Sequence, residues 1–176
     1  IAAFLIYRLR KVLGKRTGFE KSFQAQKTDK KNESTIKEVP TLDENFTKLS
    51  SAYKAMPEFN HQSFLEGAKF AFETIINAFN KSDKKTLKSL LTKDVFDSFE
   101  KAIDSGDNNP NYQFYSLVIN SVENVVVEKN IINITLKITS EQFKNEDENT
   151  VTKKQDTWTF QKSINSKSPV WLLAAT

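Results

Sequence analysis

Residues 64–76 of this chain read FLEGAKFAFETII. From Phe64 to Phe79, apolar side chains recur at intervals of three and four residues, which is the repeat of one face of an α-helix. The apolar positions are Phe64, Ala68, Phe72, Ile75, Ile76 and Phe79. We therefore predict an amphipathic helix here, beginning between His61 and Ser63 and packed against the rest of the domain.

Two shorter helices are expected after it. Ser82 and Asp83 can cap the first, and Thr92 precedes the second, which Gly106 ends. Their apolar positions are Leu87, Leu90 and Leu91, followed by Val95, Phe99, Ala102 and Ile103. Residues 107–111, rich in Asn and Asp, are expected to form a loop.

The pattern then changes from helical spacing to alternation, which is typical of β-strands. Four apolar residues of segment 132–139 alternate with Asn, Thr and Lys, so we expect a strand with one buried face. Strands are also expected over 117–128, 151–162 and 170–174, with a short turn at 128–130 and a charged hairpin loop at 144–149. Helices followed by a meander of four antiparallel strands predict an α+β fold.

Composition argues against several kinds of chemistry. The chain has 176 residues, no cysteine, one histidine (His61) and four glycines. Disulfides, thiolate metal sites and cysteine nucleophiles are therefore excluded, and no HExxH spacing or glycine-rich phosphate loop occurs. We interpret His61 as a capping or surface residue. Asp94 and Asp156 are each interpreted as a helix cap or a strand-surface residue. The alternative for each is a carboxylate that faces a pocket. We expect no enzyme, cofactor or metal.

Positive charge is concentrated at the start of the chain. Residues 1–21 carry six Lys or Arg and one Glu, whereas the remainder carries 20 Lys or Arg and 21 Asp or Glu. A nearly neutral domain lacks the clustered positive charge of a nucleic-acid surface, so no nucleic-acid partner is expected.

Residues 1–21 are interpreted as the end of a membrane anchor followed by a basic juxtamembrane segment. Residues 1–7 are apolar apart from the Tyr7 hydroxyl, and seven residues are too few to span a bilayer. The expected membrane contacts are Tyr7, Arg8, Arg10, Lys11, Lys15 and Arg16. Such a basic cluster keeps the following chain on the cytoplasmic or matrix side and attracts anionic lipids. The alternatives are a helix docked on the domain, a remnant of a targeting segment, or a solvated basic tail.

Residues 22–56 are polar and aperiodic, which is typical of a linker. A short helix is expected within residues 42–56, where Leu42, Phe46, Leu49 and Tyr53 recur at helical spacing. Pro57 is taken as the boundary, so that the folded domain covers residues 57–176. A glycine inside a strong helix costs about 1 kcal/mol relative to alanine. We therefore expect a neighbouring element to approach Gly67 closely.

Several separated motifs resemble the Tim44-like domain family. They are the helix that starts FLEGA at Phe64, the pair Leu90-Leu91 before Asp94-Val95, and the ending WTF (158–160) … PVWLLAAT (169–176). Residues 7–20 are similar to the segment after the anchor in alphaproteobacterial members (the TimA type). The resemblance covers nearly the whole chain except the polar linker.

The resemblance implies a nuclear-transport-factor-two-like fold, a cone in which helices pack on the concave face of a curved antiparallel sheet. It also implies a non-catalytic adaptor at the inner membrane. The mitochondrial relative, a subunit of the import motor, recruits a chaperone of the seventy-kilodalton class to the import channel. Its long chaperone-recruiting N-terminal region is not seen in this sequence. Translocase or chaperone components are the implied protein partners, and the domain is expected to face the cytoplasm or the matrix.

Large aromatic side chains fall on the expected core faces of the helix and the last strands. They are Phe64, Phe72, Trp158, Phe160 and Trp171. We interpret them either as plain core or as the lining of a pocket for a lipid tail or a partner's apolar side chain. Two further functions stay open, a mitochondrial ribosome-tethering relative and a small-ligand or lipid-binding protein of the same fold. The favoured reading is a membrane-tethered adaptor linked to protein translocation or membrane-protein assembly.

Overall fold

The computed structural model describes residues 40–107, 112–144 and 147–176. Helices precede strands along the chain, as expected of an α+β fold. The helices are η1 (Glu44–Leu49, a 3-10 helix), α2 (Ser50–Ala55), α3 (His61–Asn80), α4 (Lys84–Leu90) and α5 (Lys93–Asp104). The strands are β1 (Tyr112–Glu128), β2 (Ile131–Lys144), β3 (Asp147–Ser163) and β4 (Leu172–Ala175).

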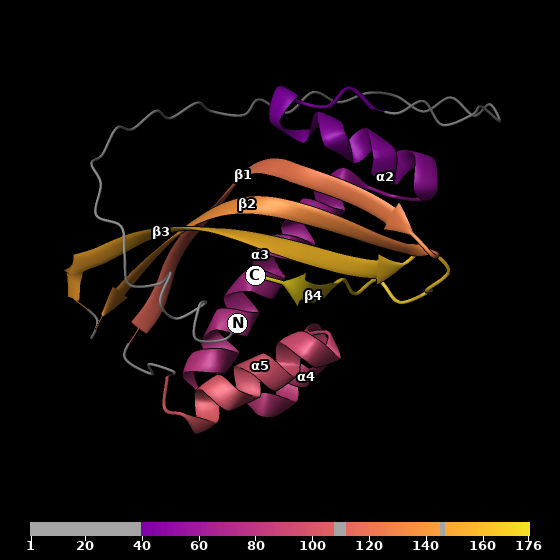
Figure 1. The fold of residues 1–176 in the computed structure, drawn as a ribbon. Helices are drawn as coiled ribbons and strands as arrows, with labels where there is room; N and C mark the ends of the chain where they lie inside the picture. The colour runs from indigo at the N-terminus through magenta and orange to yellow at the C-terminus, as the bar shows by residue number, and fades with distance from the viewer. Residues whose placement is uncertain (1–39, 108–111, 145–146) are drawn as a thin grey trace.

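The sheet is a four-stranded antiparallel meander in the order β1-β2-β3-β4. Lys129 and Asn130 both have positive φ, as the tight hairpin between β1 and β2 requires. Three register shifts interrupt the pairing of β1 with β2. Such bulges increase the twist and bend of a strand, and Figure 1 shows the long strands curving across the domain. The nuclear-transport-factor-two-like α+β fold is confirmed.

The core lies between α3 and one face of this sheet. We call this face of the sheet the inner face. It is defined by the β2 residues Ile132, Ile134, Leu136 and Ile138, all of which are fully buried. The apolar residues of α3 predicted from helical spacing supply the opposite side of the core. The outer face carries polar side chains together with a few exposed apolar ones, and its strands are joined by side-chain hydrogen bonds such as Thr135 to Thr159 at 3.0 Å.

Helix ends follow the predicted caps. The Asp83 carboxylate accepts hydrogen bonds from the backbone N–H of Thr86 at 3.1 Å and from its hydroxyl at 2.6 Å, so α4 begins after Asp83. These hydrogen bonds hold the pKa of Asp83 below 3.8. Thr92 is the N-cap position of α5, and Gly106 follows that helix with a φ of 73°.

The structure differs from the expected domain boundary at Pro57. Residues 44–55, placed in the linker, form η1 and α2 and pack along β1 (Figure 1). Leu49 and Ala52 are fully buried in the core, and Lys48 donates to the backbone oxygen of Glu123 at 2.6 Å. The folded unit therefore starts before Pro57, because two of its core side chains come from the preceding helices.

Two smaller expectations also need correction. β2 extends to Lys144 and β3 starts at Asp147, so the predicted loop over 144–149 is too long. A Cβ added at Gly67 would meet no atom within 4 Å. The expected close approach of another element to Gly67 is therefore wrong, and this glycine lies on the exposed side of α3.

Candidate functional site

The five aromatic residues predicted to lie together do so. Their rings form one continuous series of contacts, from Trp171 to Phe64 (centroids 4.7 Å apart), Phe160 (6.3 Å), Trp158 (6.3 Å) and Phe72 (4.2 Å). α3 positions the two phenylalanines eight residues apart on its inner side, and β3 and the end of the chain supply the other three rings. We call these five residues the aromatic cluster.

Most of the aromatic cluster is buried in this structure. All members except Trp171 are buried, and Trp171 packs against the core with part of its ring exposed. Tilted and edge-to-face contacts of this kind stabilise a core beyond the burial of apolar area. A ligand would have to displace one of these rings to enter, so the pocket interpretation stays a prediction.

A second aromatic group fastens α2 to the domain. Phe59 contacts Tyr53, Phe64 and Trp171, with ring centroids 5.1 to 6.1 Å apart. Tyr53 also reaches His61, whose Nδ1 lies 2.7 Å from the Tyr53 hydroxyl oxygen. His61 is therefore a partly buried contact at the start of α3, and the N-cap of this helix is Asn60, whose side chain accepts from the backbone N–H of Ser63.

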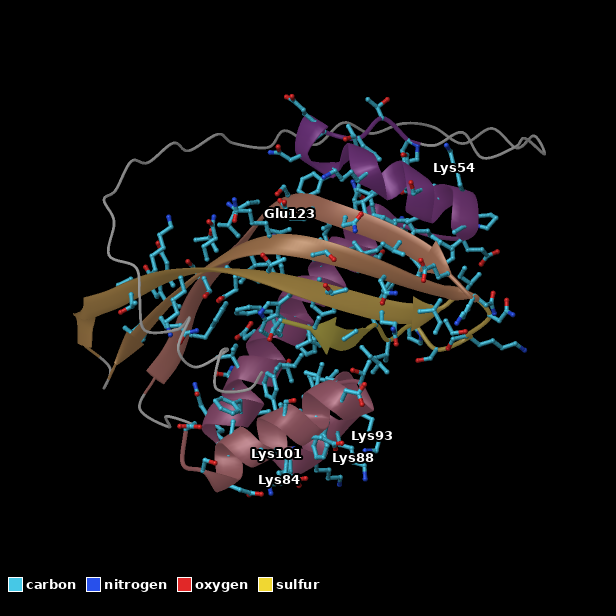
Figure 2. The ribbon with its side chains drawn as sticks, viewed as in Figure 1. Lys54, Lys84, Lys88, Lys93, Lys101 and Glu123 are labelled. Carbon is cyan, nitrogen blue, oxygen red and sulfur yellow. The ribbon has the colours of Figure 1, made fainter. Side chains whose placement is uncertain are left out.

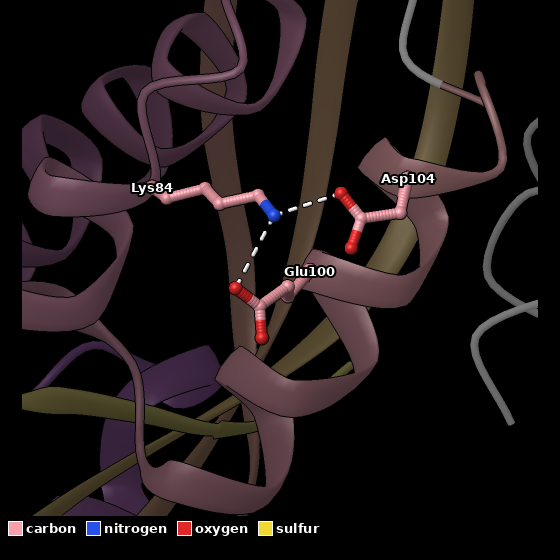
Figure 3. Close-up of polar contacts among 3 residues, drawn as sticks. All are labelled: Lys84, Glu100 and Asp104. Carbon is pink, nitrogen blue, oxygen red and sulfur yellow. Dashed lines mark hydrogen bonds and ion pairs between the residues drawn. The ribbon is translucent and has the colours of Figure 1, made fainter.

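Ion pairs balance the charge on the helical side of the domain. Lys84 of α4 lies between Asp104 (2.7 Å) and Glu100 (3.2 Å) of α5, as Figure 3 shows, and Lys93 pairs with Asp97 at 2.6 Å. These carboxylates raise the pKa of both lysines. Residues 81–107 carry six Lys and six Asp or Glu in all. Although Figure 2 shows Lys88 and Lys101 projecting from the same helices, this surface lacks the positive excess of a nucleic-acid interface.

The two aspartates singled out from the sequence lie in different surroundings. Asp94 is exposed in the first turn of α5. Asp156 is partly buried on β3, opposite Ile138, and therefore faces the inner side of the sheet. Its neighbour on that face, Lys154, is partly buried as well, and burial lowers the pKa of its ammonium group while Asp156 opposes that shift. No pattern in the sequence singled out Lys154.

One side chain stands out on the surface of α3. Phe70 is 71% exposed, one turn after Gly67, where the helix carries no side chain. Large apolar side chains exposed to this degree are frequent at protein-binding surfaces when they gather with others. The exposed Tyr115 and Val118 of β1 lie on another element, so Phe70 stands apart from them.

Two expectations concern membranes and metals. The predicted membrane contacts, Tyr7 to Arg16, lie outside the described residues. Among residues 40–107, 112–144 and 147–176, no helix has the length and apolar character needed to cross a bilayer. No three His, Cys, Asp or Glu side chains gather into a possible metal site in the same part of the chain.

Comparison with known proteins gives a match that covers nearly all of the described helices and strands. The profile of the Tim44-like domain matches residues 46–176. A protein of Rickettsia prowazekii (strain Madrid E), named Uncharacterized protein RP434, is 29% identical over 135 residues, covering 72% of this chain. The chain covers 56% of that relative's length. The matched residues start within η1 and include α2 and the four strands, in agreement with the corrected boundary. This chain is therefore a member of the Tim44-like domain family.

Proposed function

We propose that this protein is a membrane-tethered, non-catalytic adaptor that acts in protein translocation or membrane-protein assembly at the inner membrane. The observation that carries the proposal is the family match, which spans residues 46–176. Tim44-like proteins are associated with the inner membrane and with translocation, and a role of that broad kind follows from membership. The adaptor activity, the lipids and the partners are our inference.

The proposal divides the chain into three parts. Residues 1–21 form the tether, in which a short apolar run precedes five closely spaced Arg and Lys residues. Each basic residue near an anionic leaflet contributes about 1 kcal/mol of binding free energy. A polar linker follows, and the head begins at η1 instead of Pro57 because Leu49 is part of its core.

Vesicle flotation tests the tether. The full chain and a version starting at Pro40 are mixed with vesicles of neutral lipid or of neutral plus anionic lipid. We expect only the full chain to float, and only with anionic vesicles, with less binding as salt rises. A variant with the five basic residues of 8–16 changed to Gln should lose binding. A variant with Lys27, Lys30 and Lys31 changed to Gln is the control for lost charge outside the tether.

The head is proposed to meet its protein partner through the exposed side of α3 around Phe70. This side chain is the most exposed of the large apolar residues in the described part of the chain. A photo-crosslinking residue placed at Phe70 should capture a translocase, chaperone or membrane-complex subunit in native membranes. The same probe at Val127, an exposed apolar residue of β1, is the matched position. Identical products at both positions, or none at Phe70, would reject this surface.

A further inference from the structure

The inner face of the sheet changes character along β2. Its residues from Ile132 to Ile138 are apolar and fully buried, but the next two on the same face are Ser140 and Gln142. These polar side chains are nonetheless buried, with 1% and 5% of their surface exposed. Burial of polar groups in an apolar setting is unfavourable unless each finds a hydrogen-bond partner.

The strand register brings further polar side chains to the same place. On β3, Lys154 lies opposite Ser140, Thr152 opposite Gln142, and Asp156 opposite Ile138. We call these five polar residues the polar end of the inner face: Ser140, Gln142, Thr152, Lys154 and Asp156. On the other side of β2, the register places two apolar residues of β1, Leu117 and Phe114, opposite Ser140 and Gln142.

The hydroxyl of Ser140 has no hydrogen-bond partner among the described residues, although its oxygen is buried. Directly opposed residues of neighbouring strands have Cβ atoms about 5 Å apart, so one bound group can contact both Ser140 and Lys154. Ser140 therefore offers a free hydrogen-bonding group beside a partly buried ammonium group, at the margin of an apolar core.

The charges of Lys154 and Asp156 limit which ligand group can bind at the polar end of the inner face. Burial disfavours the charged form of Lys154, and the Asp156 carboxylate opposes that effect. A second singly charged acceptor next to Lys154 would act in the same direction. A doubly charged phosphate would meet stronger repulsion from Asp156. A carboxylate on an apolar body matches both the donors and the neighbouring Leu117 and Phe114.

We propose that the polar end of the inner face binds the carboxylate of a small amphiphilic molecule. The Lys154 ammonium and the Ser140 hydroxyl donate to the carboxylate oxygens, and Phe114 and Leu117 contact the apolar body. The site is distinct from the aromatic cluster and does not depend on the proposed adaptor role, because no tether or protein partner takes part.

Titration calorimetry on the full chain tests the proposal, with decanoate as the probe and decanol as its uncharged match. Decanoate should bind at least about tenfold more tightly than decanol, because a charge-assisted hydrogen bond distinguishes the two. Lys154→Gln should lower decanoate affinity about tenfold and leave decanol unchanged. Lys153→Gln is the matched control, since Lys153 is the exposed neighbour on the opposite face of β3.

Ser140→Ala separates binding from folding. It removes a hydroxyl that makes no hydrogen bond, so urea unfolding of the free protein should show no loss of stability, whereas decanoate affinity should fall severalfold. The proposal is overturned if decanoate does not bind, if decanoate and decanol bind equally, or if Lys153→Gln weakens binding as much as Lys154→Gln.

Discussion

The hydroxyl oxygen of Tyr53 lies 2.7 Å from Nδ1 of His61, and the backbone N–H of His61 donates to the same oxygen at 3.2 Å. Tyr53 belongs to α2 and His61 is the first residue of α3, so one side chain joins two helices across the Pro57 turn. Together with the burial of Leu49, this contact makes η1 and α2 part of the folded head.

Tyr53→Phe should lower the free energy of unfolding by about 1–2 kcal/mol. The change keeps the ring contact with Phe59 but removes both hydrogen bonds to His61. Urea unfolding measures the effect. Tyr115→Phe is the matched control, because Tyr115 is exposed on β1. Equal stability of the two variants would show that the helices are held by apolar packing alone.

Leu49→Ala should lower the free energy of unfolding by about 2–5 kcal/mol, the usual cost of removing a fully buried leucine side chain. Thermal and urea unfolding measure it. Val170→Ala, at an exposed position, should change stability by less than about 0.5 kcal/mol. If Leu49→Ala were equally mild, the head would begin after Pro57, as the sequence first indicated.

Gly67→Ala should raise the free energy of unfolding by up to about 1 kcal/mol, because a new methyl group meets open space and alanine favours the helix. Gly106→Ala should have the opposite effect, since Gly106 has a φ of 73° that strains any residue with a Cβ. Unfolding curves of the two variants measure both changes in stability. A loss of stability in Gly67→Ala would indicate a packing role that the structure does not show.

Acid should remove the stabilisation supplied by Asp83. Its pKa is held below 3.8 in the folded protein, so this contribution is fully present above pH 3.8 and is lost as pH falls through the folded value. Asp83→Asn should abolish that part of the pH dependence, measured as the urea midpoint at decreasing pH. Asp43→Asn is the control, because Asp43 precedes η1 without a side-chain capping bond. Identical acid profiles for both variants and the parent would contradict the capping role.

Raising the pH should increase the stability of the folded protein through Lys154. Burial lowers its pKa below 10.5, so between the folded value and 10.5 the unfolded chain binds more protons and stability rises with pH. Lys154→Met should flatten this rise in the urea midpoint. Lys153→Met, which removes an exposed lysine, should retain it. A rise that survives in Lys154→Met would have to come from another group.

The helices of the core were predictable because their apolar spacing and their caps are local properties. Residues 64–79 indicated α3, and Asp83 and Thr92 marked the starts of α4 and α5. The start of the head was not predictable in the same way. Leu49 has the helical spacing of its neighbours, but its segment is short and polar, and only packing against β1 shows that it is buried.

The aromatic cluster was also predictable from local sequence, whereas the polar end of the inner face was not. Large aromatic residues on apolar faces indicated a shared location before the structure was known. Ser140 and Lys154 did not stand out, because the expected strand ended at Thr139 and the expected loop began at Lys144. The pairing of β2 with β3 extends both strands, and that pairing depends on residues far apart in sequence.

β4 has a consequence for synthesis on the ribosome. The backbone N–H of Thr92, at the junction of α4 and α5, donates to the oxygen of Leu173 at 2.9 Å, and Leu91 forms a bridge with the same residue. Leu173 also pairs with Phe160 of β3, so it joins the helices to the sheet. Because chains are made from the N-terminus, the elements from η1 to β3 have been synthesised before β4 emerges. A nascent chain that lacks β4 leaves this junction open and exposes core surface to chaperones.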